Sequence, residues 1–240
     1  MRPRPSTRFV AEFGANVFPY TRTKAAAMIM NAKGAHADAV KVQLFRADHF
    51  PNTERARKAL YEFPRNEFGW FVRYAHSAGL KVGASAFDDD AVQLCSDTGA
   101  DFVKLATREQ PNVALRTFCQ EHFHRTVIRS VVWPMQETVE RWPREITLGC
   151  ISEYPADDRT AWHQVHSLFL NIPAPRGWSS HTVGWFDCLT AFMRGAQVIE
   201  KHIYLMEDDP ESGWSLSVQN FGSMIKTIRA YEYATARGWQ

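Results

Sequence analysis

The stretch DAVKVQLF at residues 38–45 decides the fold, together with FVKLA at 102–106 and QVIEKHI at 197–203. Each is a short apolar run of the kind that forms a buried parallel strand. Runs of the same kind recur along the chain: RFVAE at 8–12, LKVGAS at 80–85, TVIRSV at 126–131, ITLGCIS at 146–152 and GWSS at 177–180. The sequence therefore predicts eight strands.

Amphipathic stretches follow these runs and predict helices. They lie near residues 22–33, 66–78, 89–98, 112–122, 135–142, 158–169, 185–194 and 217–236. Eight strands alternating with eight helices predict a (β/α)8 TIM barrel of the α/β class. A chain of 240 residues with 45% hydrophobic content can bury one such core. We therefore expect a single barrel domain over residues 9–240, preceded by a flexible tail at residues 1–8.

Composition excludes several classes of function. The formal net charge is only +2, so a nucleic-acid partner has no support. No apolar stretch reaches about 18 residues and no signal-peptide core is present, so we expect a cytoplasmic protein without membrane contact. The cysteines are widely spaced, which favours reduced, buried thiols over a zinc site or a disulfide framework: Cys95, Cys119, Cys150 and Cys188.

Polar residues that end the apolar runs are the candidates for a site, because barrel active sites lie at the carboxyl ends of the strands. Lys41 and Lys104 stand within apolar strands, where an ammonium needs an anion or a carboxylate partner. Two interpretations stay open: an anionic ligand, or a salt bridge inside the barrel with a carboxylate such as Glu12. The hydroxyls of Ser85, Thr107 and Ser130 suit a phosphate.

Two histidines follow neighbouring apolar runs, His181 in SSHTVG and His202 in VIEKHI. Adjacent parallel strands would bring their side chains together, which makes them candidate ligands of one metal ion. A lone histidine at a strand end more often has a structural hydrogen bond, so the pair matters more than either member.

The succession AEFGAN, GAHADAVKVQLFRAD, GLKVGASAFDDDAV, GADFVKLAT, CISEYPAD, SSHTVG and GAQVIEKHI resembles the barrel domain of the sialic acid synthase family. This family includes N-acetylneuraminate, legionaminate and pseudaminate synthases, and the resemblance runs in order from about residue 9 to 230. It implies a metal-dependent transferase that condenses phosphoenolpyruvate with an aldose such as an N-acetylmannosamine-like hexosamine. The products would be a sialic-acid-like 3-deoxy-ulosonic acid and phosphate.

The resemblance also implies roles for individual residues. His181 and His202 would hold the divalent ion, Mn²⁺ first, with Mg²⁺ and Co²⁺ as alternatives. Phosphoenolpyruvate would be held by Lys41, Gln43, Ser85, Lys104, Thr107, Ser130, Ser152 and Ser179. The sugar would face Glu12, Asn16, Tyr154 and Glu211. Catalytic roles would fall to Glu12 in proton transfer, to Glu200 in ordering water, and to Tyr154.

Some motifs depart from the family pattern. Two loops differ: where relatives have NHNG this chain has NVFP at 16–19, and where they have an STG-like turn it has SVVW at 130–133. Two aspartates of the family are also replaced, one by Ser180 and the other by Glu211 in PESGWS.

Relatives carry a C-terminal antifreeze-like domain that covers the site of a partner. The sequence given stops at Gln240. Three expectations stay open: a separate antifreeze-like protein supplies the lid, the sugar does not need a lid, or the site is more open than in relatives. The resemblance also implies a homodimer, which a swapped lid would not hold together.

Two competing hypotheses stay open. The first keeps the metal and makes the protein a pyruvate aldolase or lyase, which consumes pyruvate and not phosphoenolpyruvate. The second makes it a degenerate, non-catalytic barrel that acts as a partner subunit; the altered loops favour this, and the retained lysines and histidines oppose it.

Overall fold

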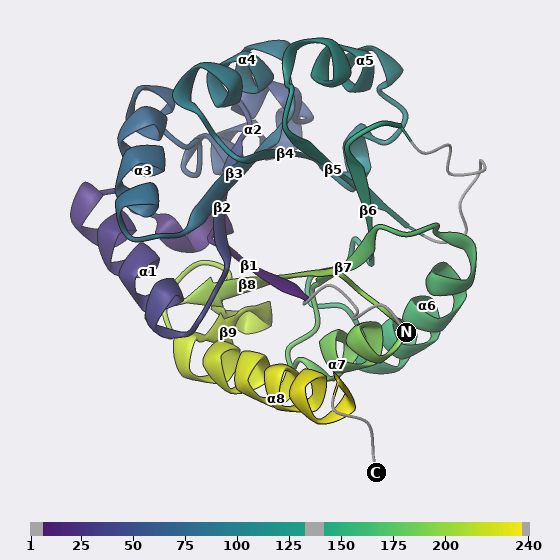
Figure 1. Ribbon diagram of the computed structural model, residues 1–240. Coiled ribbons are helices and arrows are strands. Elements are labelled where there is room, and N and C mark those ends of the chain that lie inside the picture. The colour runs from purple at the N-terminus through teal and green to yellow at the C-terminus, as the bar shows by residue number, and fades with distance from the viewer. Residues whose placement is uncertain (1–6, 133–141, 237–240) are drawn as a thin grey trace.

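The computed structural model of the chain describes residues 7–132 and 142–236. Eight parallel strands form a closed ring, because β1 pairs with β8 as well as with β2 (Figure 1). They are β1 (Arg8–Glu12), β2 (Ala39–Leu44), β3 (Lys81–Ala86), β4 (Phe102–Leu105), β5 (Thr126–Val131), β6 (Glu145–Cys150), β7 (Arg176–Ser180) and β8 (Val198–Tyr204). Every predicted strand overlaps an observed one, and the predicted (β/α)8 barrel is confirmed.

Helices surround the ring of strands (Figure 1). Those that match the predicted helices are α1 (Arg22–Gly34), α3 (Arg65–Ser77), α4 (Asp89–Thr98), α5 (Val113–His122), α6 (Asp158–Asn171), α7 (Phe186–Met193) and α8 (Val218–Ala236). The helix predicted over 135–142 lies almost wholly outside the described residues. None of the described helices is long and apolar enough to span a bilayer.

Several short elements were not predicted. The helix α2 (Asn52–Ala59) follows β2, and β9 (Leu216–Ser217) pairs with the end of β8. Four 3-10 helices lie near strand ends: η1 (Gly14–Val17), η2 (Ala47–His49), η3 (Thr107–Glu109) and η4 (Ser212–Trp214). Most of these elements follow the carboxyl end of a strand, so they shape the mouth of the barrel.

Side-chain caps fix where several helices begin. The Asp88 carboxylate accepts a hydrogen bond from the backbone N–H of Ala91 at 2.6 Å, and Asn112 accepts one from Leu115 at 3.1 Å. Thr21 caps α1 in the same way. Such caps satisfy backbone donors that the first turn of a helix leaves free. The acidic run that begins at Asp88 is therefore a helix start.

The prediction of a flexible tail over residues 1–8 is wrong for residues 7 and 8, which are ordered against β8 and the residues just before it. Arg8 begins β1 and its N–H donates to the carbonyl of Gln197, while the buried Thr7 donates its hydroxyl to the carbonyl of Ala196 at 3.0 Å. Closing the barrel needs β1 to pair with β8 along its length, which orders these residues. Residues 1–6 lie outside the described part of the chain.

The barrel interior is filled by an apolar layer with a polar layer next to it. The apolar layer consists of Val10, Ala39, Phe102, Ile128, Leu148 and Val198. Residues two apart in a strand point to the same face. Each member of the apolar layer is followed, two positions later, by a residue of the predicted site or by Cys150. The polar residues two positions further on are Glu12, Lys41, Lys104, Ser130, Cys150 and Glu200. Because side chains alternate between the two faces of each strand, the polar residues of the candidate site lie directly next to the buried apolar layer.

Gly177 in β7 tests this packing. A Cβ at this position would lie 2.2 Å from the carbonyl oxygen of Val198 in β8. Gly177→Ala must push two paired strands apart, and we expect it to lower the free energy of unfolding by about 3 kcal/mol. Urea denaturation followed by circular dichroism measures the change. Gly34→Ala is the control, because a Cβ there meets nothing within 4 Å; equal stability of the two variants would contradict the packing.

Candidate active site

Strand register brings the predicted residues together at one end of the barrel. Glu12 in β1 lies beside Lys41 in β2 on one side and beside His202 in β8 on the other. Ser85 lies beside Lys104, and Ser179 beside Glu200. Parallel strands end at the same edge, so residues far apart in the sequence become neighbours.

A buried charge quartet, Glu12, Lys41, Lys104 and Glu200, lies at the centre of this site. The Lys41 ammonium forms an ion pair with Glu12, donates to the Ser85 hydroxyl at 2.8 Å and lies 3.7 Å from Glu200 Oε2. The Lys104 ammonium pairs with Glu200 and donates to Ser179 at 3.1 Å. Salt bridges inside the barrel are thus present. The lysines by themselves therefore do not require an anionic ligand.

The surroundings shift the ionisation of the charge quartet in opposite ways. Burial lowers the pKa of Lys41, Glu200 opposes this shift and Lys104 adds to it, and together they set the pKa at about 7. Burial alone would raise the pKa of Glu200, but the charges of Lys104 and Lys41 outweigh it and hold that pKa at about 2. Glu200 is therefore ionised near neutral pH, whereas Lys41 is close to its midpoint.

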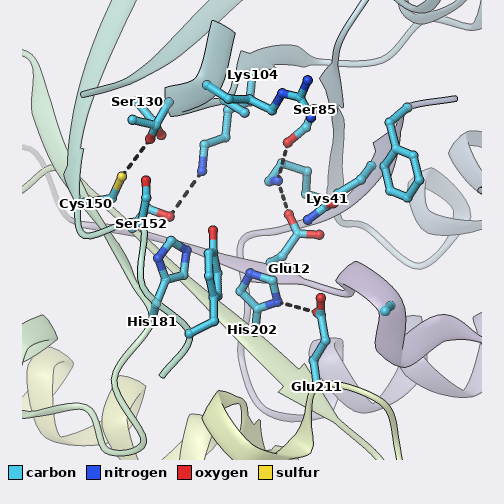
Figure 2. Close-up of a pocket in the computed structure, with 18 of the residues that line it drawn as sticks. Glu12, Lys41, Ser85, Lys104, Ser130, Cys150, Ser152, His181, His202 and Glu211 are labelled. Carbon is cyan, nitrogen blue, oxygen red and sulfur yellow. Dashed lines mark hydrogen bonds and ion pairs between the residues drawn. The ribbon is translucent and has the colours of Figure 1, made fainter. Parts of the chain in front are cut away.

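The two histidines face the same cavity as the charge quartet. Their ring centroids lie 5.6 Å apart, and Figure 2 shows them side by side, with Glu211 next to His202. Nδ1 of His181 contacts the carbonyl of Ile151, and Nδ1 of His202 lies 2.8 Å from the Glu211 carboxylate. Burial and the neighbouring His202 lower the pKa of His181 well below its ordinary value, so the imidazole is neutral.

This donor set fits a divalent metal ion. In the neutral tautomer whose Nδ1 donates to its acceptor, Nε2 of each ring keeps a lone pair for a ligand. Within the described residues, no group of three or more His, Cys, Asp or Glu side chains is placed to hold a metal. A metal here would have His181 and His202 as its protein ligands, with its other positions open to water or substrate.

The cavity has a volume of about 670 Å³. Of the predicted site residues, those lining it are Glu12, Lys41, Gln43, Ser85, Lys104, Thr107, Ser130, Ser152, Tyr154, Ser179, His181, Glu200, His202 and Glu211. The Ser130 hydroxyl and the indole N–H of Trp214 are buried without a hydrogen-bond partner in the described part of the chain. Buried polar groups without partners are costly, so these donors mark places where a polar ligand would fit.

Asn16 is the predicted site residue that does not line the cavity. It is fully buried, and its amide donates to Ser215 and to the carbonyl of Ile203, both at 2.9 Å. Its carbonyl oxygen accepts the N–H of Glu211 at 2.6 Å. The predicted contact with the sugar is therefore wrong in geometry. Asn16 instead holds the segment that carries Glu211.

Aromatic side chains and one thiol complete the lining of the cavity. The Tyr154 ring packs at a tilt against His181 with ring centroids 4.3 Å apart, and the ring centroid of Trp214 lies 5.8 Å from that of Tyr154. Tyr154 and Trp214 both line the cavity. Cys150 also lines the cavity, at 2.9 Å from the Thr107 hydroxyl, and burial raises the pKa of its thiol. It is a packing residue and no activated nucleophile.

The sequence reasoning missed one wall of the cavity. It is formed by α2, η3 and neighbouring loops, which contribute Phe45, Phe50, Arg57, Lys58, Tyr61, Phe87 and Arg108. One signal was available: about twenty residues separate the second predicted strand from the next predicted helix, and so long an unstructured connection is uncommon inside a compact domain.

The fold and the site define a (β/α)8-barrel enzyme whose cavity lies at the carboxyl ends of its strands. The chain belongs to the NeuB family, whose model matches residues 28–240. This confirms the resemblance to the sialic acid synthases. The protein is accordingly an enzyme of sugar metabolism.

Individual relatives agree with this assignment. The chain is 25% identical to the N,N'-diacetyllegionaminic acid synthase of Legionella pneumophila, over 88% of this chain and 68% of that protein. It is 25% identical to the pseudaminic acid synthase of Campylobacter jejuni, over 88% of this chain and 69% of the relative. The fold matches a crystal structure of N-acetylneuraminic acid synthetase from Leptospira borgpetersenii with a TM-score of 0.85 and 21% identity, covering 98% and 86% of the two chains.

Gly14 tests the geometry around His202. Its φ is +47°, and a Cβ there would lie 2.0 Å from Glu211 Oε2 and 2.9 Å from His202 Nδ1. We expect Gly14→Ala to separate the carboxylate from the imidazole and to destabilise the protein by about 1–2 kcal/mol. Urea denaturation and the ¹⁵N chemical shifts of the His202 ring measure the two effects.

Gly213→Ala is the matched control, because that position is on the same segment as Glu211 and a Cβ there meets nothing within 4 Å. An unchanged His202 signal in Gly14→Ala would contradict the geometry.

Proposed function

We propose that this barrel condenses phosphoenolpyruvate with the open-chain aldehyde of an N-acetylmannosamine-like hexosamine or a related aldose. The products are a sialic-acid-like 3-deoxy-ulosonic acid and phosphate. The observation that carries the proposal is the convergence of Lys41, Lys104 and the unpartnered Ser130 hydroxyl with two histidines in one cavity of a NeuB-family barrel. The names of the relatives support an acidic sugar as the product.

The serine-rich side of the cavity suits phosphoenolpyruvate. In Figure 2, Lys104, Ser85 and Ser130 lie at the end of the cavity away from Glu211. Hydrogen bonds from hydroxyls and ammonium groups to ionised oxygens are short and strong, which favours a phosphate and a carboxylate here. The remaining predicted contacts to this substrate come from side chains that line the same cavity, Gln43, Thr107, Ser152 and Ser179.

The charge balance supports a metal ion in the same reaction. The charge quartet contains two ammonium groups and two carboxylates, so it offers no net charge to a multiply anionic substrate. A divalent ion on His181 and His202, Mn²⁺ first and Mg²⁺ or Co²⁺ as alternatives, would add that charge. When bound, it would polarise the aldehyde carbonyl of the acceptor.

The chain's own residues orient the reacting groups and move protons. The C3 carbon of phosphoenolpyruvate bonds to the aldehyde carbon, whose oxygen must take up a proton. Glu12 and its ion-pair partner Lys41 would supply this proton. Water then adds at C2 and phosphate leaves. The ionised Glu200 orients this water, and Tyr154 and Glu211 hold the sugar from the histidine side.

Phosphate release tests the proposal. Purified protein with Mn²⁺, phosphoenolpyruvate and a panel of N-acetylmannosamine, diamino-hexoses and simple aldoses should release phosphate with one class of sugar. Chelation by EDTA should stop the release and added Mn²⁺ restore it. His202→Ala should lose at least about a hundredfold in rate, whereas exposed His163→Ala should keep wild-type activity.

Other outcomes of this assay decide against the proposal. Consumption of pyruvate without phosphoenolpyruvate would identify an aldolase or lyase. Absence of turnover together with absence of phosphoenolpyruvate binding would favour the degenerate barrel. The homodimer, the separate lid protein and the cytoplasmic location stay predictions.

The pH dependence of phosphoenolpyruvate binding tests the role of Lys41. Its pKa in the free protein is about 7, and an anion bound beside it favours the charged form. Below about pH 7 the Kd should be nearly constant, because Lys41 is already protonated. Above about pH 7 binding must take up a proton, so the Kd should rise about tenfold per pH unit.

Titration calorimetry in buffers of different ionisation enthalpy measures both the Kd and the proton uptake. In Lys41→Met the proton uptake above about pH 7 should disappear. A wild-type Kd that does not change between about pH 6 and about pH 9 would contradict the assignment.

A further inference from the structure

Lys201 lies in the middle of β8 but on the face that points away from the cavity. Its neighbours Glu200 and His202 line the cavity, and side chains alternate along a strand, so the Lys201 side chain extends behind the barrel wall, where α7 packs. The residue is 0% exposed. The outward positions on either side of it, Ile199 and Ile203, are apolar, so packing alone does not require a lysine there.

The Lys201 ammonium binds the backbone that leaves β7. It donates to the hydroxyl of Ser180 at 3.1 Å and to the carbonyl of Thr182, so it contacts the residues on both sides of His181. No carboxylate oxygen of the described residues lies within 4.0 Å of it. An ammonium removed from water costs several kcal/mol unless partners compensate for the lost hydration. The hydrogen bonds that compensate this buried charge are therefore those to the segment that carries His181.

His181 needs such an anchor because it lies beyond the strand. The ladder between β7 and β8 ends where Ser180 pairs with Lys201, and β7 itself ends at Ser180. His202, by contrast, lies within β8, where it pairs with Glu12. The sheet therefore fixes His202 directly, whereas the position of His181 depends on contacts made by the loop.

Two other contacts hold the same loop from other sides. The carbonyl of His181 accepts the N–H of Ala156 at 2.9 Å, and the Thr182 hydroxyl donates to the buried carboxylate of Asp187 at 3.1 Å. The loop is thus held from the β6 side, from α7 and, through the lysine, from β8. Held in this way, the ring of His181 lies in the cavity with its centroid 5.6 Å from that of His202 (Figure 2).

We propose that Lys201 is a positioning residue for His181. From behind the barrel wall, its ammonium fixes the backbone between β7 and α7 so that the imidazole faces His202 in the cavity. The inference rests on the proposed function where it concerns the divalent ion, because a displaced His181 would no longer share that ion with His202. It also makes a claim about the metal-free protein, in which the direction of the His181 ring depends on Lys201.

Mn²⁺ binding tests the role toward the ion. Electron paramagnetic resonance of free Mn²⁺ gives the Kd for the wild type and for Lys201→Met, which keeps most of the length of the side chain and removes its charge. We expect the Kd to rise about tenfold in Lys201→Met, because residues that orient a metal ligand usually have an effect of this size. Lys226→Met, which removes an exposed lysine from α8, should bind Mn²⁺ as the wild type does.

The metal-free protein gives a second readout. In the wild type, Nδ1 of His181 contacts the carbonyl of Ile151, so one tautomer should dominate the ¹⁵N spectrum of this ring. In Lys201→Met the His181 signals should move toward the average of two tautomers. Those of His202 should stay in place, because β8 and Glu211 still hold that ring. A general loss of structure would move the signals of both rings, so the difference between them isolates positioning.

Ser180→Ala covers the case in which Lys201→Met does not fold. It removes one of the two contacts and leaves the lysine in place, so the Kd for Mn²⁺ should rise about threefold and the His181 signals should shift in the same direction. Thr190→Val is the matched control, because it removes a buried hydroxyl of α7 that donates to the carbonyl of Phe186 at 3.0 Å. It should keep the wild-type Kd and His181 signals. If Lys201→Met does not fold, wild-type values in Ser180→Ala overturn the inference.

The outcomes separate this inference from the proposed function. Wild-type Mn²⁺ affinity and unchanged His181 signals in Lys201→Met overturn the positioning role and leave the synthase reaction intact. Equal shifts of both histidines overturn it as well, since they indicate a general structural role. If the wild type binds no Mn²⁺ or turns over no acceptor, the proposed function fails, and the metal-free spectra still decide: a shift confined to His181 supports the positioning role, and no shift overturns it.

Discussion

The whole site depends on the buried ion pairs between Lys41 and Glu12 and between Lys104 and Glu200. An ion removed from water costs several kcal/mol unless partners compensate for the lost hydration, and removing one partner of such a pair is strongly destabilising. Here each charge has a partner on a neighbouring or facing strand, and Ser85 and Ser179 add hydrogen bonds. The barrel can therefore keep ionised groups on top of an apolar layer, ready to contact a substrate without first being desolvated.

The pairing of these lysines with carboxylates also explains how charge is distributed along the cavity. The charge quartet is balanced, the two imidazoles are oriented by Ile151 and Glu211, and the mouth is positive. The cations Arg57, Lys58 and Arg108 therefore lie at the mouth, whereas the deeper lysines are paired with buried carboxylates. This order follows from the geometry of the side chains and not from the overall charge of +2, which is nearly neutral.

Most of the fold and of the site's inner layer could be predicted from the sequence, because apolar runs fix the strands and polar residues at their ends fix the rim. Asn16 could not be assigned correctly, since it lies in η1 beyond the end of β1, and the sequence does not reveal whether a side chain there points into the cavity or behind it. The partner of Lys41 was left open for the same reason. The wall around α2 escaped prediction because its aromatic and basic residues have no strand-like or strongly apolar periodicity, and only the packing of Phe50 brings them together.

The pairing of β1 with β8 places Glu12 of the first strand beside His202 of the last. A nascent or truncated chain that has not yet supplied β8 lacks Glu200 as well as His202, so Lys104 would have no carboxylate partner and the interior could not bury its charges at low cost. The step that closes the barrel therefore also completes the site, because the pairing of β1 with β8 brings Glu12, Glu200 and His202 together.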